Sequence, residues 1–291
     1  MKLATYSYYG STHVGIIVHD EVVELQAAAP GLPDEMCQLL AGGRDALAAA
    51  ARAVDRATAR IPLDDVRLES PLLRPPKILA AGLNYADHIA ESGLQPPEYP
   101  VLFNKQSTSV TGPYDPIHLP RASHALDYEG ELGLVIGRRC RHVPRERASE
   151  VIAGYLVLND VTVRDWQLRT PTMTMGKSWD THCPMGPWIT TADEVGDPHS
   201  LGIRTWVDGE LRQDSNTKEL IFDCFELVAH LSTAFTLEPG DVIATGTPAG
   251  VGIAMKPPRF LTVGDVVRIE IETLGEIENP VIPEPEDTVV I

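Results

Sequence analysis

Two glutamates one residue apart, Glu129 and Glu131, lie in a stretch whose second half has the pattern of a buried β-strand. The stretch is LDYEGELGLVIG (126–137), which is apolar and partly β-branched from Leu132 onward. Side chains at positions i and i+2 of a strand point to the same face, so both carboxylates are directed at one spot at the edge of a core. Their mutual repulsion is costly there. A hard cation held by oxygen ligands is the simplest remedy.

A third acid follows the next apolar run, AGYLVLND (153–160), which ends in Asp160. Together the three acids predict a Mg²⁺ or Mn²⁺ site with open positions for water or substrate. The alternative is an edge strand that carries two solvated acids. Gly130, between the glutamates, favours a close backbone approach or a bulge. Asp127 has the same parity, and we expect it to be solvated or to support the ligands from behind.

The composition of the chain argues against several classes of binding partner. The chain has 291 residues and a net charge of −17, which disfavours nucleic acids and anionic membrane surfaces but not a small anionic substrate. No stretch approaches 18 apolar residues, and the start, MKLATYSYYG, lacks the apolar region of a signal peptide. Scattered cysteines without a C-x-x-C pair indicate reduced thiols, so we expect a cytoplasmic protein. These are Cys37, Cys140, Cys183 and Cys224.

The pattern along the chain divides it into a small N-terminal α/β domain, 1–72, and a main domain, 73–291. The first contains a hairpin pattern at 12–25 and an Ala-rich helical segment at 35–59. The second consists mainly of short β-branched runs, with few helices, the clearest at 221–233. Since parallel βαβ alternation is absent, we expect a mixed α/β, β-rich fold, a roll or sandwich with helices packed outside.

The segment NYADHIAES (84–92) places His88 and Glu91 three residues apart, on one face of a helix. A carboxylate paired with an imidazole fixes its tautomer and raises its basicity, which suits a base acting on water. A surface helix with an incidental ion pair gives the same pattern. Gly and Pro residues follow, so we expect 84–100 to be a mobile lid.

Three further segments carry candidate substrate-binding groups. In VTVRDWQ (161–167), Arg164 and Gln167 share a helix face next to Asp160 and are suited to a carboxylate and a carbonyl. Lys177, in MGKSWD, is suited to an oxyanion. Thr247 lies in the Gly-rich loop IATGTPAGVG, which is not a P-loop because it lacks the G-K-[ST] ending. Each segment alone is also compatible with an ordinary structural or solvated role.

Together and in this order, GLNYADHIAESG, the E-x-E strand, LNDVTVRDWQ, GKSWD, VDGELRQ and LEPGDVIATGTPAGVG resemble the fumarylacetoacetate hydrolase family over about residues 76–278. The resemblance implies a β-sandwich roll behind a small N-terminal domain, usually in a homodimer. It also implies Mg²⁺, Mn²⁺ or Ca²⁺ as the cofactor, and hydrolysis of a C–C bond in a 2,4-diketo acid of acylpyruvate or fumarylpyruvate type, as in aromatic catabolism.

Carried over by position, the resemblance implies Glu129, Glu131 and Asp160 as metal ligands. It implies His88 and Glu91 as the pair that activates water, and Lys177 as a catalytic cation. Arg164, Gln167 and Thr247 would contact the substrate. Leu83 stands where acylpyruvase-like members often have Arg, which indicates a different or less polar substrate.

Two other functions fit the same residues. One is a 2-oxo acid decarboxylase or 2-hydroxy-dienoate isomerase, which needs no attacking water. The other is a noncatalytic ligand-binding module, whose mark would be a lost ligand or a lost His88–Glu91 pair, and neither is lost. In every case the expected partner is a small diketo or oxo acid.

Overall fold

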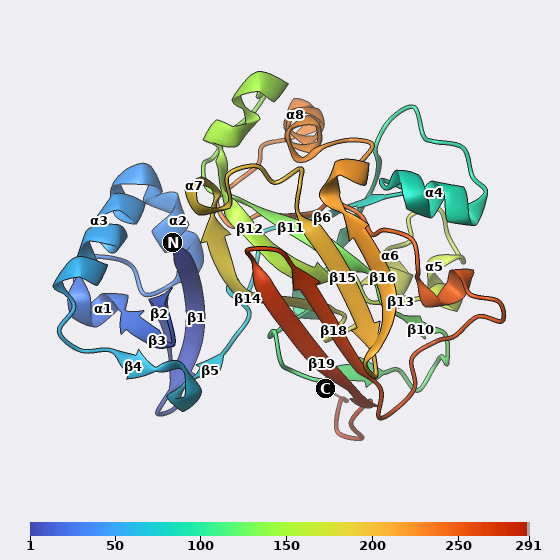
Figure 1. Cartoon of the computed structure of the whole chain (residues 1–291), viewed down its shortest axis with the longest axis horizontal. Coiled ribbons are helices and arrows are strands. Elements are labelled where there is room, and N and C mark those ends of the chain that lie inside the picture. Colours follow the sequence, from blue (N-terminus) through green and yellow to red (C-terminus); the bar gives the residue numbers. More distant parts are fainter. Residues whose placement is uncertain (290–291) are drawn as a thin grey trace.

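The chain folds into a mixed α/β, strand-rich structure, as predicted. The computed structural model describes residues 1–289. A large sheet runs through the molecule, and a second sheet packs on one side of it (Figure 1). Most strand pairs are antiparallel, which agrees with the absence of βαβ alternation.

The strands and helices have the following bounds. In spatial order, the large sheet contains β4 (Ile61–Pro62), β3 (Glu21–Glu24), β2 (Ser11–Val18), β1 (Lys2–Tyr8), β14 (Cys183–Thr191), β12 (Ile152–Asn159), β11 (Gly130–Ile136), β17 (Val242–Ala244), β6 (Ile78–Gly82) and β7 (Val101–Lys105), with β5 (Arg67–Leu68) on β1 and β8 (Val110–Thr111) on β14. The second sheet contains β16 (Glu210–Asn216), β15 (Gly202–Val207), β18 (Val266–Ile271), β19 (Gly275–Pro283) and β9 (Ile117–Leu119), and β10 (Leu126–Asp127) pairs with β13 (Thr162–Val163). The α-helices are α1 (Leu25–Ala28), α2 (Met36–Ala41), α3 (Gly43–Arg56), α4 (Ala86–Ser92), α5 (Arg164–Gln167), α6 (Thr174–Lys177), α7 (Ala192–Val195) and α8 (Cys224–Ala234). Short 3₁₀ helices span Leu63–Asp65, Ser107–Ser109, Arg145–Glu150, Thr217–Glu219 and Gly252–Ala254.

The two faces of the large sheet bury different cores. Along β11, Leu132 and Leu134 belong to the core shared with the second sheet and α8, whereas Val135 belongs to the core beneath the N-terminal helices. This alternation follows from the two-residue period of a strand. It also puts Glu131 on the face turned away from the second sheet.

The N-terminal strands are continuous with the large sheet, because β1 pairs with β14 at Lys2↔Thr190 and Leu3↔Ile189. Figure 1 shows the first helices grouped on the outer side of these strands. The predicted hairpin at 12–25 is present as β2 and β3, and the Ala-rich segment forms α2 and α3. The predicted domain boundary at residue 72 stays a prediction.

The clearest predicted helix begins later along the chain than expected. Helix α8 begins at Cys224 rather than at 221, because the Asp223 carboxylate caps it by accepting hydrogen bonds from the amides of Phe225 (2.9 Å) and Glu226 (2.8 Å). Within residues 1–289, no helix is long and apolar enough to cross a membrane.

Candidate metal and substrate site

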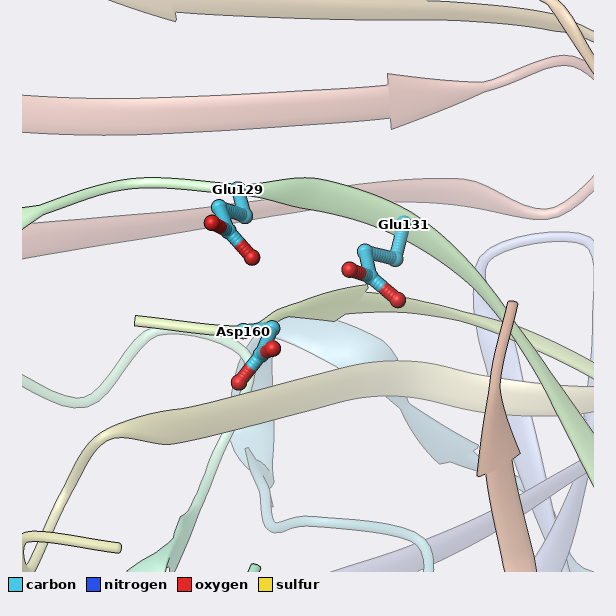
Figure 2. A group of neighbouring side chains, drawn as sticks. All are labelled: Glu129, Glu131 and Asp160. Carbon is cyan, nitrogen blue, oxygen red and sulfur yellow. The ribbon is translucent and has the colours of Figure 1, made fainter. Parts of the chain in front are cut away.

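Three acids converge where two central strands meet the loops at one end of the large sheet. One carboxylate oxygen from each of Glu129, Glu131 and Asp160 lies within 4.8 Å of the others. Figure 2 shows the two glutamates side by side on one segment, with Asp160 facing them from the neighbouring chain segment. All three side chains are buried. The predicted grouping of these acids is therefore present.

Strand alternation and one glycine explain how the acids come together. Glu129 immediately precedes β11, and Glu131 is its second residue, so both point to the same face. Gly130 points the opposite way, toward the second sheet, where an added Cβ would lie 2.4 Å from Oγ1 of Thr205. The glycine thus permits the close approach of the two sheets that the sequence indicated.

Two buried lysines contact the acids. Lys177 Nζ donates hydrogen bonds to Oε2 of Glu129 and to Oδ2 of Asp160, both at 2.6 Å. Lys105, at the end of β7, donates to Oδ1 of Asp160 at 2.6 Å and to the backbone carbonyl of Lys177. Burial alone would lower the pKa of Lys177, but Asp160 and Glu129 raise it by more than burial lowers it. The pKa of Lys177 therefore lies above its ordinary value, and the side chain is charged. Lys105 was missed from the sequence, since a lone lysine at the end of a strand carries no local signal.

A buried ion pair supports the acids from the far side. Arg164 Nε donates to Oδ2 of Asp127 at 2.8 Å, and Arg164 Nη1 lies 2.6 Å from Oε1 of Glu129. Asp127 also accepts hydrogen bonds from the amides of Gly252 (2.8 Å) and Ile253 (2.9 Å). The solvated alternative for Asp127 is therefore wrong, and its supporting role stands: it holds both Arg164 and the 252–253 turn.

The buried side chains at this site carry more negative than positive charge. Four carboxylates are buried here against three buried cations, Lys105, Lys177 and Arg164. Within residues 1–289, no basic side chain forms an ion pair with Glu131. Its Oε2 accepts a hydrogen bond from the backbone amide of Gly246, at 2.8 Å. Burial, then Asp160 and Glu129, raise the pKa of Glu131 well above its usual range.

Glu129 shows the opposite shift. Its burial alone would raise its pKa, but Lys177 and Arg164 outweigh burial and lower the pKa to about 2. A hard divalent cation held by carboxylate oxygens would compensate the charge of Glu131. The donor set of Glu129, Glu131 and Asp160 therefore fits Mg²⁺ or Mn²⁺, and their role as ligands stays a prediction.

The histidine–glutamate pair lies on α4, beside the acids. His88 Nδ1 is 3.4 Å from Oε2 of Glu91. The His88 imidazole is also near enough to contribute to the lowered pKa of Glu129, after Lys177 and Arg164. Glu91 accepts hydrogen bonds from the amide of Gly250, at 3.1 and 3.2 Å. The pair is formed as predicted, and the helix is attached to the Gly-rich loop.

The remaining predicted side chains are near the acids but already have partners. Gln167 Oε1 accepts a hydrogen bond from Arg164 Nη1 at 3.1 Å. Thr247 is buried, and its hydroxyl donates to the carbonyl of Gly130 (2.9 Å) and accepts from Nε2 of Gln213 (2.8 Å). Substrate contacts by Gln167 and Thr247 stay predictions, and in this structure Thr247 connects the Gly-rich loop to the strand of the acids.

Comparisons with known proteins find relatives that match nearly the whole chain. A mitochondrial oxaloacetate tautomerase of Xenopus laevis is 42% identical over 276 residues, covering 94% of this chain and 86% of that protein. The crystal structure of maleylpyruvate hydrolase from Sphingobium sp. SYK-6, in complex with manganese(II) and pyruvate, matches with a TM-score of 0.83 and 36% identity, covering 98% of this chain and all of the other. The 5-carboxymethyl-2-hydroxymuconate delta-isomerase of Mycobacterium smegmatis matches with a TM-score of 0.80 and 37% identity, with the same coverage.

The family model described as the C-terminal domain of fumarylacetoacetate hydrolase matches residues 77–282. This range contains every candidate site residue named above. The relatives and solved structures with a named activity are enzymes, either hydrolases or isomerases and tautomerases. The chain belongs to the fumarylacetoacetate hydrolase family.

Proposed function

We propose that this protein is a divalent-metal-dependent enzyme that acts on a short 2-oxo acid through its enol or enolate form. The observation that carries the proposal is the group of three buried carboxylates, Glu129, Glu131 and Asp160, with one negative charge left uncompensated beside buried cations. A cation held there supplies Lewis-acid polarisation of the substrate oxygens. Mn²⁺ is supported by the manganese complex of the related maleylpyruvate hydrolase, and Mg²⁺ fits the same oxygen ligands.

The basic side chains at the site are suited to an anionic substrate. Arg164 Nη2 is buried and has no hydrogen-bond partner within residues 1–289. Because an unsatisfied buried donor is costly, a carboxylate oxygen of a bound substrate would stabilise it. Lys177 is charged and would neutralise an oxyanion that develops next to the acids. The net charge of −17 is therefore compatible with an anionic substrate.

The finer activity that the His88–Glu91 pair supports is hydrolysis of a C–C bond in a 2,4-diketo acid of acylpyruvate type. His88, oriented by Glu91 at 3.4 Å, would take a proton from water, which then attacks the distal carbonyl. Lys177 would stabilise the oxyanion formed there. Cleavage leaves a 2-oxo acid and a carboxylic acid. The related maleylpyruvate hydrolase supports this choice.

The second candidate is tautomerisation of oxaloacetate, with decarboxylation or isomerisation of related acids as variants. It is supported by the 42% identity to the oxaloacetate tautomerase over nearly the whole chain. This reaction moves one proton between carbon and oxygen and needs no attacking water. The buried cations at the site would serve it equally well.

One experiment tests both candidates. The purified protein is supplied with Mg²⁺ or Mn²⁺ and given acylpyruvates, oxaloacetate and dienoic diacids, while ultraviolet absorbance reports the loss of enol. Released pyruvate, carboxylic acid and CO₂ are measured in the same samples. Pyruvate with a carboxylic acid indicates the hydrolase, and faster enol decay without either indicates the tautomerase. No metal-dependent acceleration with any of these acids would refute the proposal.

We also propose that the protein is a homodimer and that its small-molecule partner is an oxo or diketo acid. Light scattering of the purified protein at several concentrations checks the dimer. The cytoplasmic location stays a prediction.

A further inference from the structure

A large cavity lies between the N-terminal helices and the main sheet, at the opposite end of β11 from Glu131. Its volume is about 1080 Å³, slightly larger than the roughly 300–1,000 Å³ typical of small-molecule sites. Its apolar lining includes Leu47, Ala51 and Ile152. None of the residues predicted to bind metal or substrate lines it.

Three arginines converge on this cavity from two separate segments. Arg44 comes from the first turn of α3, and Arg138 and Arg139 come from the loop that follows β11. All three are exposed, and within residues 1–289 none forms an ion pair or a side-chain hydrogen bond. A concentration of unpaired cations is unusual in a chain with a net charge of −17, where acids are abundant as partners.

The acids at the cavity have other partners nearby. Glu150 is held by Arg147, whose Nε and Nη2 donate to its two oxygens at 2.9 and 2.8 Å. The pKa of Asp193 is lowered, chiefly by a hydrogen bond from Thr191. Arg44 and Arg138 also help to lower the pKa of Glu150, after Arg147, but within residues 1–289 they form no ion pair with it. Arg44, Arg138 and Arg139 can therefore still bind an external anion beside the apolar lining.

The structure assigns to this cavity, because of these arginines, a binding site for a small multivalent anion of the class of nucleoside phosphates and tricarboxylates. We name the group Arg44, Arg138 and Arg139 the arginine site. Guanidinium groups favour phosphate and carboxylate oxygens because they present paired N–H donors. The apolar lining would receive the uncharged part of the ligand.

The arginine site is separate from the proposed catalytic site, although the same two strands connect them. Strand β11 carries Glu131 at one end and leads into Arg138 at the other, and β12 runs from Ile152 in the cavity to the residue before Asp160. From Glu131 to Gly137 the strand covers about 20 Å, at roughly 3.3 Å per residue. A ligand at the arginine site cannot also contact the acids, so the inference does not depend on the proposed function.

The test is calorimetric titration of the full-length protein with ADP, citrate and inorganic phosphate, at constant ionic strength and without divalent metal. ADP and citrate distinguish a phosphate source from a carboxylate source, and phosphate tests the charged group alone. We expect binding of ADP or citrate to weaken about tenfold or more in Arg44→Glu and Arg138→Glu, because each reversal removes a charge-assisted contact.

The matched control is Arg52→Glu, which reverses an exposed arginine of the same helix that does not line the cavity. Binding there should equal that of the unaltered protein. No binding of any of the three anions, or an equal loss in Arg52→Glu, would overturn the inference. Thermal unfolding of each variant without ligand confirms that the fold is retained.

Discussion

Arg164 Nε lies 2.8 Å from Oδ2 of Asp127, and both side chains are buried at the base of the candidate site. The same guanidinium contacts Glu129 through Nη1, so one cation positions both an acid of the cluster and the carboxylate behind it. This relationship places the 252–253 turn, the Asp127 strand and helix α5 in one hydrogen-bonded unit.

The first prediction concerns this buried pair. Asp127→Asn removes a charge that Arg164 needs, and breaking a buried pair costs about 3–5 kcal/mol of unfolding free energy. The control is Asp214→Asn, because the Arg204–Asp214 pair is exposed on both sides and is expected to contribute about 0–1 kcal/mol. Urea unfolding of both variants measures the difference. Equal losses would show that the Asp127–Arg164 pair is not a major contributor to stability.

The second prediction concerns the uncompensated acid. Because the pKa of Glu131 is raised in the folded state, its ionised form destabilises the metal-free protein. Glu131→Gln should therefore raise the melting temperature of the metal-free protein and still weaken Mn²⁺ binding by about tenfold or more. Calorimetry with and without Mn²⁺ checks both effects. Glu98→Gln, at an exposed position, should change neither. Unchanged Mn²⁺ affinity in Glu131→Gln would exclude it as a ligand.

The third prediction separates the two candidate chemistries. If His88 activates water, His88→Ala should lower acylpyruvate hydrolysis by about 10²-fold. Mn²⁺ binding should persist, because His88 is not among the three acids. Tautomerisation of oxaloacetate should persist as well if it needs only the cation and the buried lysines. Hydrolysis at the unaltered rate in this variant would remove His88 from the mechanism.

The fourth prediction concerns the stability of the protein in acid. Burial lowers the pKa of His182 to about 3, although its hydrogen bond to the His118 carbonyl opposes the shift. Since the unfolded value is about 6.5, the contribution of neutral His182 is complete above pH about 6.5 and is lost as the pH falls to about 3. In this window His182→Gln should flatten the dependence of unfolding free energy on pH by up to about 1.4 kcal/mol per unit. His124→Gln, at an exposed position, should leave the slope unchanged.

The fifth prediction concerns motion at the site entrance. We expect residues 84–100 to be more protected from hydrogen exchange when oxalate, a mimic of a 2-oxo acid, is bound with the metal. Asp87 and Glu91 accept hydrogen bonds from the amides of Ala249 (3.3 Å) and Gly250 (3.1 Å). The Gly-rich loop should therefore change its exchange together with α4. Strong and equal protection with and without oxalate would show a rigid wall.

Local patterns in the sequence predicted the elements and the acids well, because both depend on short-range periodicity. The i, i+2 spacing of Glu129 and Glu131 determines their common face whatever the rest of the fold. The Asp208–Gly209 turn between β15 and β16 likewise follows from two adjacent residues that tolerate positive φ.

What the sequence could not predict depends on contacts between distant segments. Lys105 reaches Asp160 across 55 positions, and its own neighbours do not distinguish it from a surface lysine. Asp127 has the parity of the glutamates, but its burial depends on Arg164 and on the 252–253 turn, which join it only in the folded chain. The cavity of the arginine site likewise exists only where α3 approaches the end of β11.

The pairing of β1 with β14 has a practical consequence for dissecting the protein. A fragment that begins at residue 73 would uncover one side of β14, which pairs with the β12 strand that leads to the candidate site. Unpaired strand edges are templates for association with other chains, so such a fragment should aggregate rather than behave as a minimal enzyme. Shortened forms for crystallography or engineering should therefore retain the first strands.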